Sequence, residues 1–259
     1  MIDPSRLKAV VFDLDDTLCG YWDASKKALR QTFAELDLPG QTPESMVRHW
    51  AEAFREFAPT LKQTQWYEVY LKEGQPTRTE QMRRTLAKAG CDDPDQARKV
   101  GDRYGELRDC YLELFPDART VLDRLAQRWP LGLMTNGPAD IQRQEIATCG
   151  LDGMFELVLI EGEQGEGKPN VSVFKKAETH FGAEPDELLM VGNSYGHDIE
   201  PALRYGWRAI WIRRPSDLPP SADLKANPQP EERPAGSPDP DAEIRELSEL
   251  LKILDCEFA

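Results

Sequence analysis

Apolar residues near the start of the chain form one short run that ends in a group of carboxylates. Residues 9–12 read Ala-Val-Val-Phe, and Asp13, Asp15 and Thr17 follow directly. A run of this length and β-forming character predicts a buried strand. Carboxylates crowded at a strand end resist ionising together unless a cation lies among them, and Mg²⁺ prefers oxygen ligands. An acidic turn followed by a helix with Thr17 as its cap would have the same sequence. This stretch alone therefore fits both a cation site and an ordinary turn.

Helical periodicity replaces strand signals in residues 19–115. Apolar residues recur there three and four positions apart, as Trp50 and Phe54 do, and this spacing predicts amphipathic helices. We expect an all-helical domain of four or more helices, inserted after the first strand. Most of its aromatic rings suit the core of that domain. Tyr21 and Trp22 lie only a few residues from the carboxylates, so we select them as candidates to contact a substrate.

Strand and helix patterns alternate from residue 116 onward. Four more short apolar runs predict strands at 131–134, 157–160, 188–191 and 208–212, with helices between them. Alternation of this kind is typical of a parallel sheet with helical crossovers. The predicted fold class is therefore α/β: a Rossmann-like, three-layer core of residues 1–18 and 116–259 that carries the helical domain 19–115 as an insertion.

The end of the chain is rich in proline. Eight of the 20 prolines fall between Pro215 and Pro240, which predicts an extended or irregular loop over 215–240. Asp239 and Pro240 suit the start of a helix. Apolar residues at helical spacing beyond them predict one closing helix that packs on the sheet.

Polar residues follow three further strands of the predicted sheet. Thr135 and Asn136 end the second strand, Lys168 lies at a Gly-Pro bend after the third, and Asn193 and Asp198 follow the fourth. The carboxyl ends of parallel strands meet at one edge of a sheet. We therefore expect one site with carboxylates, a hydroxyl and an ammonium group, suited to Mg²⁺ beside a phosphate. Taken singly, each group is also explained by an ordinary turn, a loop lysine or a helix-terminal charge.

Composition limits the partners and the compartment. A formal charge of −14 and a pI of about 4.8 disfavour a nucleic-acid polymer, which needs clustered Lys and Arg. No apolar run approaches the roughly 20 residues of a membrane helix, and the N-terminus lacks a secretory pattern. Five cysteines are scattered without a C-x-x-C pair, which argues against a zinc site or a disulfide framework. We expect a cytoplasmic protein with no membrane partner, and the sequence leaves its oligomeric state open.

Together, the strand-end residues resemble the motifs of the haloacid dehalogenase-like (HAD) hydrolase superfamily, specifically its phosphatases. The D-x-D-x-T motif is matched by Asp13, Asp15 and Thr17, the second motif by Thr135, the third by Lys168, and the fourth in part by Gly192-Asn193-Ser194 and Asp198. The resemblance covers essentially the whole chain apart from the proline-rich loop. The inserted helices resemble the family's C1-type cap, which covers the site and selects substrates.

The resemblance implies hydrolysis of a phosphate ester in two steps. Asp13 would attack phosphorus and form an aspartyl-phosphate, and Asp15 would protonate the leaving oxygen and then activate water. Mg²⁺ would be held by the Asp13 carboxylate, the Asp15 backbone carbonyl and Asp198. Three residues would bind the phosphoryl oxygens, namely Thr135, Asn136 through its amide, and Lys168.

One position departs from the family pattern. The fourth motif usually begins Gly-Asp, whereas this chain has Gly192-Asn193. The amide of Asn193 still offers a carbonyl oxygen, but it brings one negative charge fewer than a carboxylate. Asn193 is therefore expected to be a weaker metal ligand than the aspartates.

Two other functions remain open at this point. A 2-haloacid dehalogenase of the same superfamily is disfavoured by Asp15, because a departing halide needs no proton. A non-catalytic phosphate-binding protein on the same fold is supported only by Asn193. We favour a Mg²⁺-dependent phosphatase that acts on a small phosphorylated metabolite, and Tyr21 and Trp22 tilt the prediction toward a sugar phosphate or a nucleotide.

Overall fold

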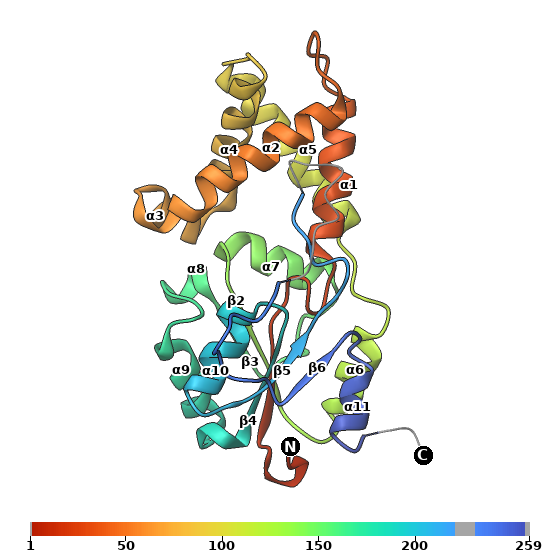
Figure 1. Cartoon of the computed structure of the whole chain (residues 1–259), viewed down its shortest axis with the longest axis vertical. Helices are drawn as coiled ribbons and strands as arrows, with labels where there is room; N and C mark the ends of the chain where they lie inside the picture. Colours follow the sequence, from red (N-terminus) through yellow and green to blue (C-terminus); the bar gives the residue numbers. More distant parts are fainter. Residues whose placement is uncertain (1, 221–230, 257–259) are drawn as a thin grey trace.

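Six parallel strands make the sheet at the centre of the fold (Figure 1). The computed structural model describes residues 2–220 and 231–256. The strands are β1 (Ala9–Phe12), β2 (Leu131–Thr135), β3 (Leu157–Ile160), β4 (Leu188–Gly192), β5 (Arg208–Ile212) and β6 (Ala242–Ile244). Their order is β3-β2-β1-β4-β5-β6, and every neighbouring pair is parallel. The strand that ends in the carboxylates therefore lies inside the sheet, between β2 and β4.

Helices cover both faces of this sheet. They are α6 (Ala118–Leu125), α7 (Ala139–Thr148), α8 (Glu161–Gln164), α9 (Val171–Phe181), α10 (Glu200–Arg204) and α11 (Glu249–Ile253), with the single turns η1 (Pro4–Arg6), η3 (Pro185–Glu187) and the π-helical η4 (Tyr195–Ile199). Alternate β1 side chains point to opposite faces: Val10 and Phe12 pack with α6, α7 and α11, whereas Val11 packs with α9 and α10. The predicted three-layer α/β fold is confirmed.

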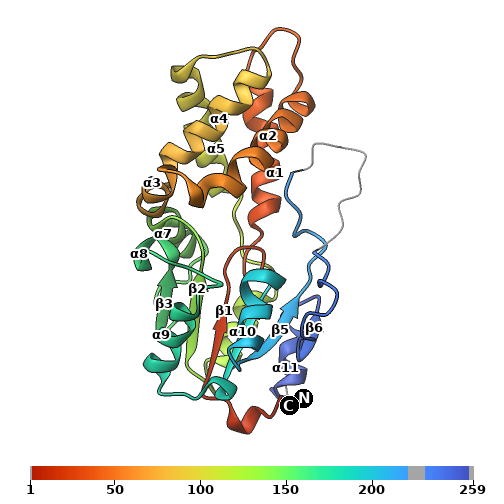
Figure 2. The same ribbon diagram turned by 60° about the vertical axis from the view of Figure 1, so that its left-hand side comes forward.

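The helices of the inserted segment lie together beyond the carboxyl ends of the strands (Figure 2). They are α1 (Tyr21–Ala34), α2 (Pro43–Phe57), the short η2 (Ala58–Gln63), α3 (Trp66–Lys72), α4 (Gly74–Lys88) and α5 (Pro94–Tyr111). They have a hydrophobic core of their own, in which Leu29, Trp50 and Met82 are buried. None of the helices in the described part of the chain is long and apolar enough to cross a membrane.

The closing segment differs from its prediction. The sequence predicts one helix from Asp239, but residues 242–244 form β6 and only Glu249–Ile253 are helical as α11. Asp241 explains the difference, because its backbone N–H donates to the Ala209 carbonyl at 2.9 Å and its carboxylate accepts from the Ala209 N–H at 3.0 Å. These bonds fasten the chain to β5 before a helix can begin.

The proline-rich loop is partly described. Residues 215–220 and 231–240 carry neither helix nor strand, as the proline content predicts. Residues 221–230 lie outside the described residues.

Candidate active site

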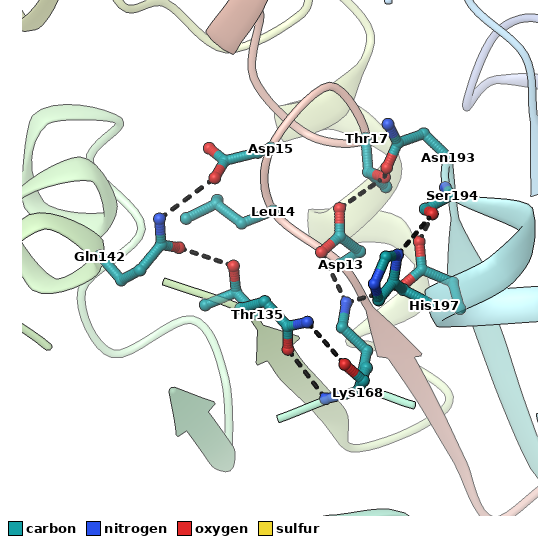
Figure 3. A network of polar contacts seen from close by, with 12 residues as sticks. Asp13, Leu14, Asp15, Thr17, Thr135, Gln142, Lys168, Asn193, Ser194 and His197 are labelled. Atoms are coloured by element: carbon teal, nitrogen blue, oxygen red, sulfur yellow. Dashed lines mark hydrogen bonds and ion pairs between the residues drawn. The ribbon is translucent and has the colours of Figure 1, made fainter. Parts of the chain in front are cut away.

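A buried ammonium group lies between two carboxylates at the carboxyl end of β1. Lys168 Nζ is 2.7 Å from Asp13 Oδ1 and 2.6 Å from Asp198 Oδ1, and Figure 3 shows Lys168 pointing at Asp13. The side chains come from the end of β1, the loop before α9, and η4. Lys168 is 2% exposed and Asp198 is 1% exposed. Because two buried carboxylates would repel each other strongly, the ammonium is what balances their charge in the absence of another cation.

Local geometry fixes both carboxylates. A side chain at Gly192 would place its Cβ 2.3 Å from Asp198 Oδ2, so the glycine at the end of β4 allows the close approach of Asp198. The Ser194 N–H then donates to Asp198 Oδ2 at 2.9 Å. The Thr17 hydroxyl donates to Asp13 Oδ2 at 3.0 Å, opposite the oxygen that contacts Lys168. Each carboxylate thus has one oxygen on Lys168 and one held by a neighbouring donor.

Burial changes the acidity of these groups. It raises the pKa of Asp13 to about 6, although the Lys168 ammonium opposes the rise. It also raises the pKa of Asp15 to about 6, and the nearby Asp13 carboxylate adds to this rise. For Lys168, burial acts in the opposite direction, but the two carboxylates raise its pKa overall. Lys168 therefore stays charged at neutral pH, whereas Asp13 and Asp15 lose their protons less readily than exposed aspartates.

Asp15 points away from Lys168, toward helix α7. Gln142 Nε2 donates to Asp15 Oδ2 at 3.1 Å, and Gln142 Oε1 accepts from the Thr135 hydroxyl at 2.6 Å (Figure 3). Gln142 Nε2 also donates to Glu145 Oε2 at 2.7 Å, and Glu145 pairs with Arg108 of α5 at 3.2 Å. The orientation of Asp15 is thus set by a network that joins the sheet edge to the inserted helices.

Asn136 holds the loop that carries Lys168. Its Nδ2 donates to the Lys168 carbonyl at 2.7 Å, and its Oδ1 accepts from the Lys168 N–H at 2.8 Å. Both polar atoms of the Asn136 side chain are used in this pair. The side chain therefore positions Lys168, and any contact of Asn136 with a phosphoryl group falls to its backbone amide.

Oxygen ligands for a cation gather beside Lys168. The Thr17 hydroxyl contacts Asp13 Oδ2 and lies 3.2 Å from Asn193 Oδ1. The Asp13 carboxylate and the Asn193 amide oxygen are therefore both within hydrogen-bond distance of the same hydroxyl. Apart from its ion pair with Lys168, Asp198 Oδ1 is buried with no hydrogen-bond partner among the described residues. Within residues 2–220 and 231–256, no three His, Cys, Asp or Glu side chains are grouped to hold a metal ion. Two carboxylates and an amide oxygen nevertheless fit Mg²⁺, which keeps several waters and uses few protein ligands.

Asn193 has an acidic neighbour in the proline-rich loop. Its Nδ2 donates to Asp217 Oδ2 at 2.8 Å, and its backbone carbonyl accepts from the indole N–H of Trp211 at 2.7 Å. Burial raises the pKa of Asp217 to about 6, although the hydrogen bond from Asn193 opposes the rise. Asp217 thus supplies a carboxylate close to the position where the family pattern has one.

Two adjoining cavities lie between the sheet edge and the inserted helices. The larger, of about 500 Å³, is lined by Asp13, Lys168 and Trp22 among others. The smaller, of about 200 Å³, reaches beneath α2 and α4. Asp15 and Tyr21 line both cavities. Both aromatic residues that the sequence selected, Tyr21 and Trp22, thus line the same cavity as Asp13.

Polar contacts close the far side of these cavities. Lys62 Nζ lies 2.6 Å from Glu161 Oε1, and the Tyr67 hydroxyl donates to the same oxygen at 2.8 Å. The Gly74 N–H donates to Asp140 Oδ1 at 3.0 Å. The inserted helices therefore rest on α7 and α8 through a small number of directional contacts.

The family model for the haloacid dehalogenase-like hydrolase matches residues 7–206. The chain belongs to this family. The family prediction made from the motifs is therefore confirmed, and with it the prediction of a hydrolase.

Relatives of this HAD hydrolase include two phosphatases. A phosphoserine phosphatase of Thermus thermophilus is 32% identical over 85% of this chain and 95% of its own length. The N-acylneuraminate-9-phosphatase of Rattus norvegicus is 27% identical over 98% of both chains. Among solved structures, the HAD hydrolase YfnB of Bacillus subtilis, described as bound to magnesium, matches with a TM-score of 0.71. That structure is 20% identical and covers 96% of this chain and 99% of its own, so it shows the shared fold.

Sequence reasoning missed several polar residues of the HAD hydrolase site. Gln142 and Glu145 lie three positions apart on α7 and are 2% and 0% exposed, so polar residues on the buried side of a helix were the available signal. Arg108 is likewise buried on α5. Asp217 gave no signal, because it comes 24 positions after its partner Asn193 in an irregular loop.

Proposed function

We propose that this HAD hydrolase is a Mg²⁺-dependent phosphatase that cleaves a small phosphorylated metabolite through an aspartyl-phosphate on Asp13. The supporting observation is the Asp13 carboxylate itself, held between Lys168 and Thr17 where it lines the larger cavity. Its class, phosphoric monoester hydrolase, follows from the family and from the phosphatase relatives. The roles of the individual residues are our proposal.

In the first step, an oxygen of Asp13 attacks phosphorus and the ester oxygen departs. Lys168 and Thr135 line the same cavity as Asp13, and with the Asn136 backbone amide they bind the phosphoryl oxygens once the Thr135 hydroxyl turns from Gln142 Oε1 to the substrate. Preorganised donors of this kind stabilise the charge that develops on the transferring group. Holding nucleophile and phosphate together also removes much of the entropic barrier.

Asp15 acts as the acid and then as the base. Its raised pKa leaves the Asp15 carboxyl group protonated more often near neutral pH than an exposed aspartate, so it can give a proton to the departing oxygen. After transfer, the resulting carboxylate takes a proton from the water that attacks the aspartyl-phosphate. Gln142 contributes by holding the Asp15 carboxyl group in a fixed orientation.

The proposed cation site uses Asp13 and Asp198, the Asn193 amide oxygen as a weaker ligand, and the Asp15 backbone carbonyl. Mg²⁺ bound there supplies positive charge next to the phosphoryl group. Lys168 and Mg²⁺ would then divide the charge of the two carboxylates between them, which leaves the Lys168 ammonium freer to face the phosphate.

Residues 19–115 serve in this proposal as the cap that encloses the substrate. They line most of the smaller cavity, and Tyr21 and Trp22 bring aromatic surface to the larger one. Ring faces of this kind suit a sugar phosphate or a nucleotide. Asp15 continues to disfavour a dehalogenase, and the hydrogen bond from Gln142 and the raised pKa of Asp15 support the proposal that it is an acid for an oxygen leaving group.

A phosphate-release screen tests the proposed function. The purified chain is assayed against a panel of sugar, nucleotide and acid phosphates in millimolar Mg²⁺, and again in EDTA. We expect release of phosphate from at least one ester with Mg²⁺ and loss of that activity in EDTA. The absence of release from every ester would contradict the proposal, and halide release from a 2-haloacid would favour the dehalogenase instead.

A further inference from the structure

One cation of the inserted helices faces the smaller cavity without a partner among the residues that the structure describes. Arg78 of α4 lines this cavity, and within the described residues no carboxylate or other acceptor pairs with its guanidinium. Arg108 lines the same cavity but is paired with Asp109 at 3.0 Å and with Glu145 at 3.2 Å. Arg78 therefore carries the uncompensated positive charge of this space.

The position of Arg78 is set by shape rather than by charge. A side chain at Gly105 of α5 would place its Cβ 1.6 Å from Arg78 Nη1 and 2.8 Å from Arg78 Cζ. The guanidinium thus occupies the space that the missing Gly105 side chain leaves open. The Arg78 side chain thus extends from α4 to α5, and the space beside Gly105 holds its guanidinium without neutralising its charge.

A second residue of this cavity, Gln81, carries a side-chain oxygen with no partner among the described residues. Gln81 lies three positions after Arg78 on α4, one helical turn away on the same side. Its Nε2 donates to the Trp50 carbonyl at 3.1 Å, whereas its Oε1 is buried with no hydrogen-bond partner in the described part of the chain. Gln81 is 6% exposed. A buried acceptor of this kind is normally satisfied. This oxygen has almost no exposed surface, so a donor on a ligand reaches it only when the Gln81 side chain turns toward the cavity.

The remaining walls are largely apolar. Trp50, Phe54 and Ile141 line the cavity around the polar groups. An ionic contact among such walls is less screened than one in water. A guanidinium also matches the planar, two-oxygen shape of a carboxylate and can bind it through two hydrogen bonds.

We propose that Arg78 binds a carboxylate of the substrate, so that the enzyme prefers phosphate monoesters of hydroxy or amino acids. The phosphoryl group lies at Asp13 in the larger cavity, and the acid end extends past Asp15 into the smaller one. When the Gln81 side chain turns toward the cavity, its Oε1 accepts from a hydroxyl or amino group next to the carboxylate. This inference rests on the proposed function and narrows its substrate from any small phosphate ester to a phosphorylated acid.

Matched substrate pairs test the subsite. 6-Phosphogluconate is compared with glucitol 6-phosphate, and 3-phosphoglycerate with glycerol 3-phosphate, since each pair exchanges a carboxylate for a hydroxymethyl group. The kcat/KM values are measured for the wild type, Arg78→Gln, Gly105→Ala and Arg30→Gln. Arg30 is exposed on α1 and lines neither cavity. Arg30→Gln is therefore the control for the loss of one arginine elsewhere on the inserted helices.

We expect the wild type to prefer the acid in at least one pair. Arg78→Gln should lower kcat/KM for that acid about 10- to 100-fold, as for a lost charged hydrogen-bond pair, and should act mainly through KM. The neutral partner should change little. Gly105→Ala keeps the charge but fills the slot, so it should shift the same ratio in the same direction, and Arg30→Gln should leave it unchanged.

Two results would overturn the carboxylate subsite but not the phosphatase activity. One is a wild type with equal kcat/KM for the acid and the neutral member of both pairs. The other is an Arg78→Gln variant that loses kcat/KM equally on the two members. Failure to hydrolyse any ester would instead overturn the proposed function. The subsite is then tested by measuring the binding of both members of a pair by isothermal titration calorimetry, where equal binding of 6-phosphogluconate and glucitol 6-phosphate contradicts it.

Discussion

Asn193 donates its side-chain amide to Asp217 at 2.8 Å, and this bond turns the amide oxygen toward Thr17. The orientation matters because only the oxygen end of an amide can bind a cation. A carboxylate from the loop thus sets the direction of a neutral residue at the position where the family pattern has an acid. The Asp217 carboxylate thus lies near the proposed cation site, but one hydrogen bond further from it than a carboxylate at position 193 would be.

Asn193→Asp should therefore strengthen Mg²⁺ binding and weaken the metal-free protein. We expect the Mg²⁺ concentration for half-maximal activity to fall about tenfold, since ligand charge is a main determinant of affinity. Without Mg²⁺, the new carboxylate would repel Asp217 and lower the melting temperature. The control is Gln127→Glu, which adds one carboxylate at an exposed position that lines neither cavity. An unchanged Mg²⁺ requirement would show that Asn193 does not contact the ion.

Lys168 should be essential for the stability of the metal-free fold. Lys168→Met leaves Asp13 and Asp198 buried with no counter-charge, and breaking a buried pair in this way costs about 3–5 kcal/mol. Urea unfolding in EDTA measures the loss, and added Mg²⁺ should restore part of it. Lys175→Met, at an exposed position of α9, should unfold like the wild type. A Lys168 variant as stable as the wild type in EDTA would contradict the charge balance described here.

Asp15→Asn should separate the two chemical steps. An alkyl phosphate needs a proton on its leaving oxygen, so its turnover should fall about 10²- to 10⁴-fold. p-Nitrophenyl phosphate has a leaving group that departs without a proton. It should therefore still give a burst of nitrophenol while the second step remains slow. Asp37→Asn, in an exposed loop, is the control. Equal losses on both substrates, with no burst, would argue against Asp15 as the acid.

Stability should respond to pH in a direction opposite to that of ordinary acid denaturation. Asp13, Asp15 and Asp217 have pKa values raised to about 6, so between about pH 4 and 6 the folded chain binds more protons than the unfolded one. Stability from these groups is present below that window and is lost as the pH rises through 6.

The melting temperature in EDTA should accordingly rise when the pH is lowered from 8 to 5.5. The stabilisation by Mg²⁺ should shrink over the same change, because protons and the cation compete for the carboxylates. Differential scanning fluorimetry with and without Mg²⁺ measures both effects. The same Mg²⁺-induced shift at both pH values would be inconsistent with a site built on Asp13.

Local patterns were sufficient to predict β1 to β5 and the polar residues that follow β1 to β4. The run before Asp13 is apolar and short, and the rule that parallel strands share one carboxyl edge then brings Lys168 and Asp198 to the same place. Residues that act through tertiary contact were not predictable in this way. Glu145 looks like an ordinary helix residue until its packing beneath Asp15 is seen, and β6 depends on a pairing with β5 that Asp241 initiates.

The phosphate transferred to Asp13 provides the most direct test of the account. The wild type is mixed with a hydrolysed ester and Mg²⁺, quenched in acid within one turnover, and digested for mass spectrometry. We predict a phosphoryl group on the peptide that contains Asp13, and neither this adduct nor measurable turnover in Asp13→Asn, with Asp37→Asn behaving as the wild type. Turnover by Asp13→Asn at the wild-type rate, or a phosphoryl group on another residue, would contradict the central claim.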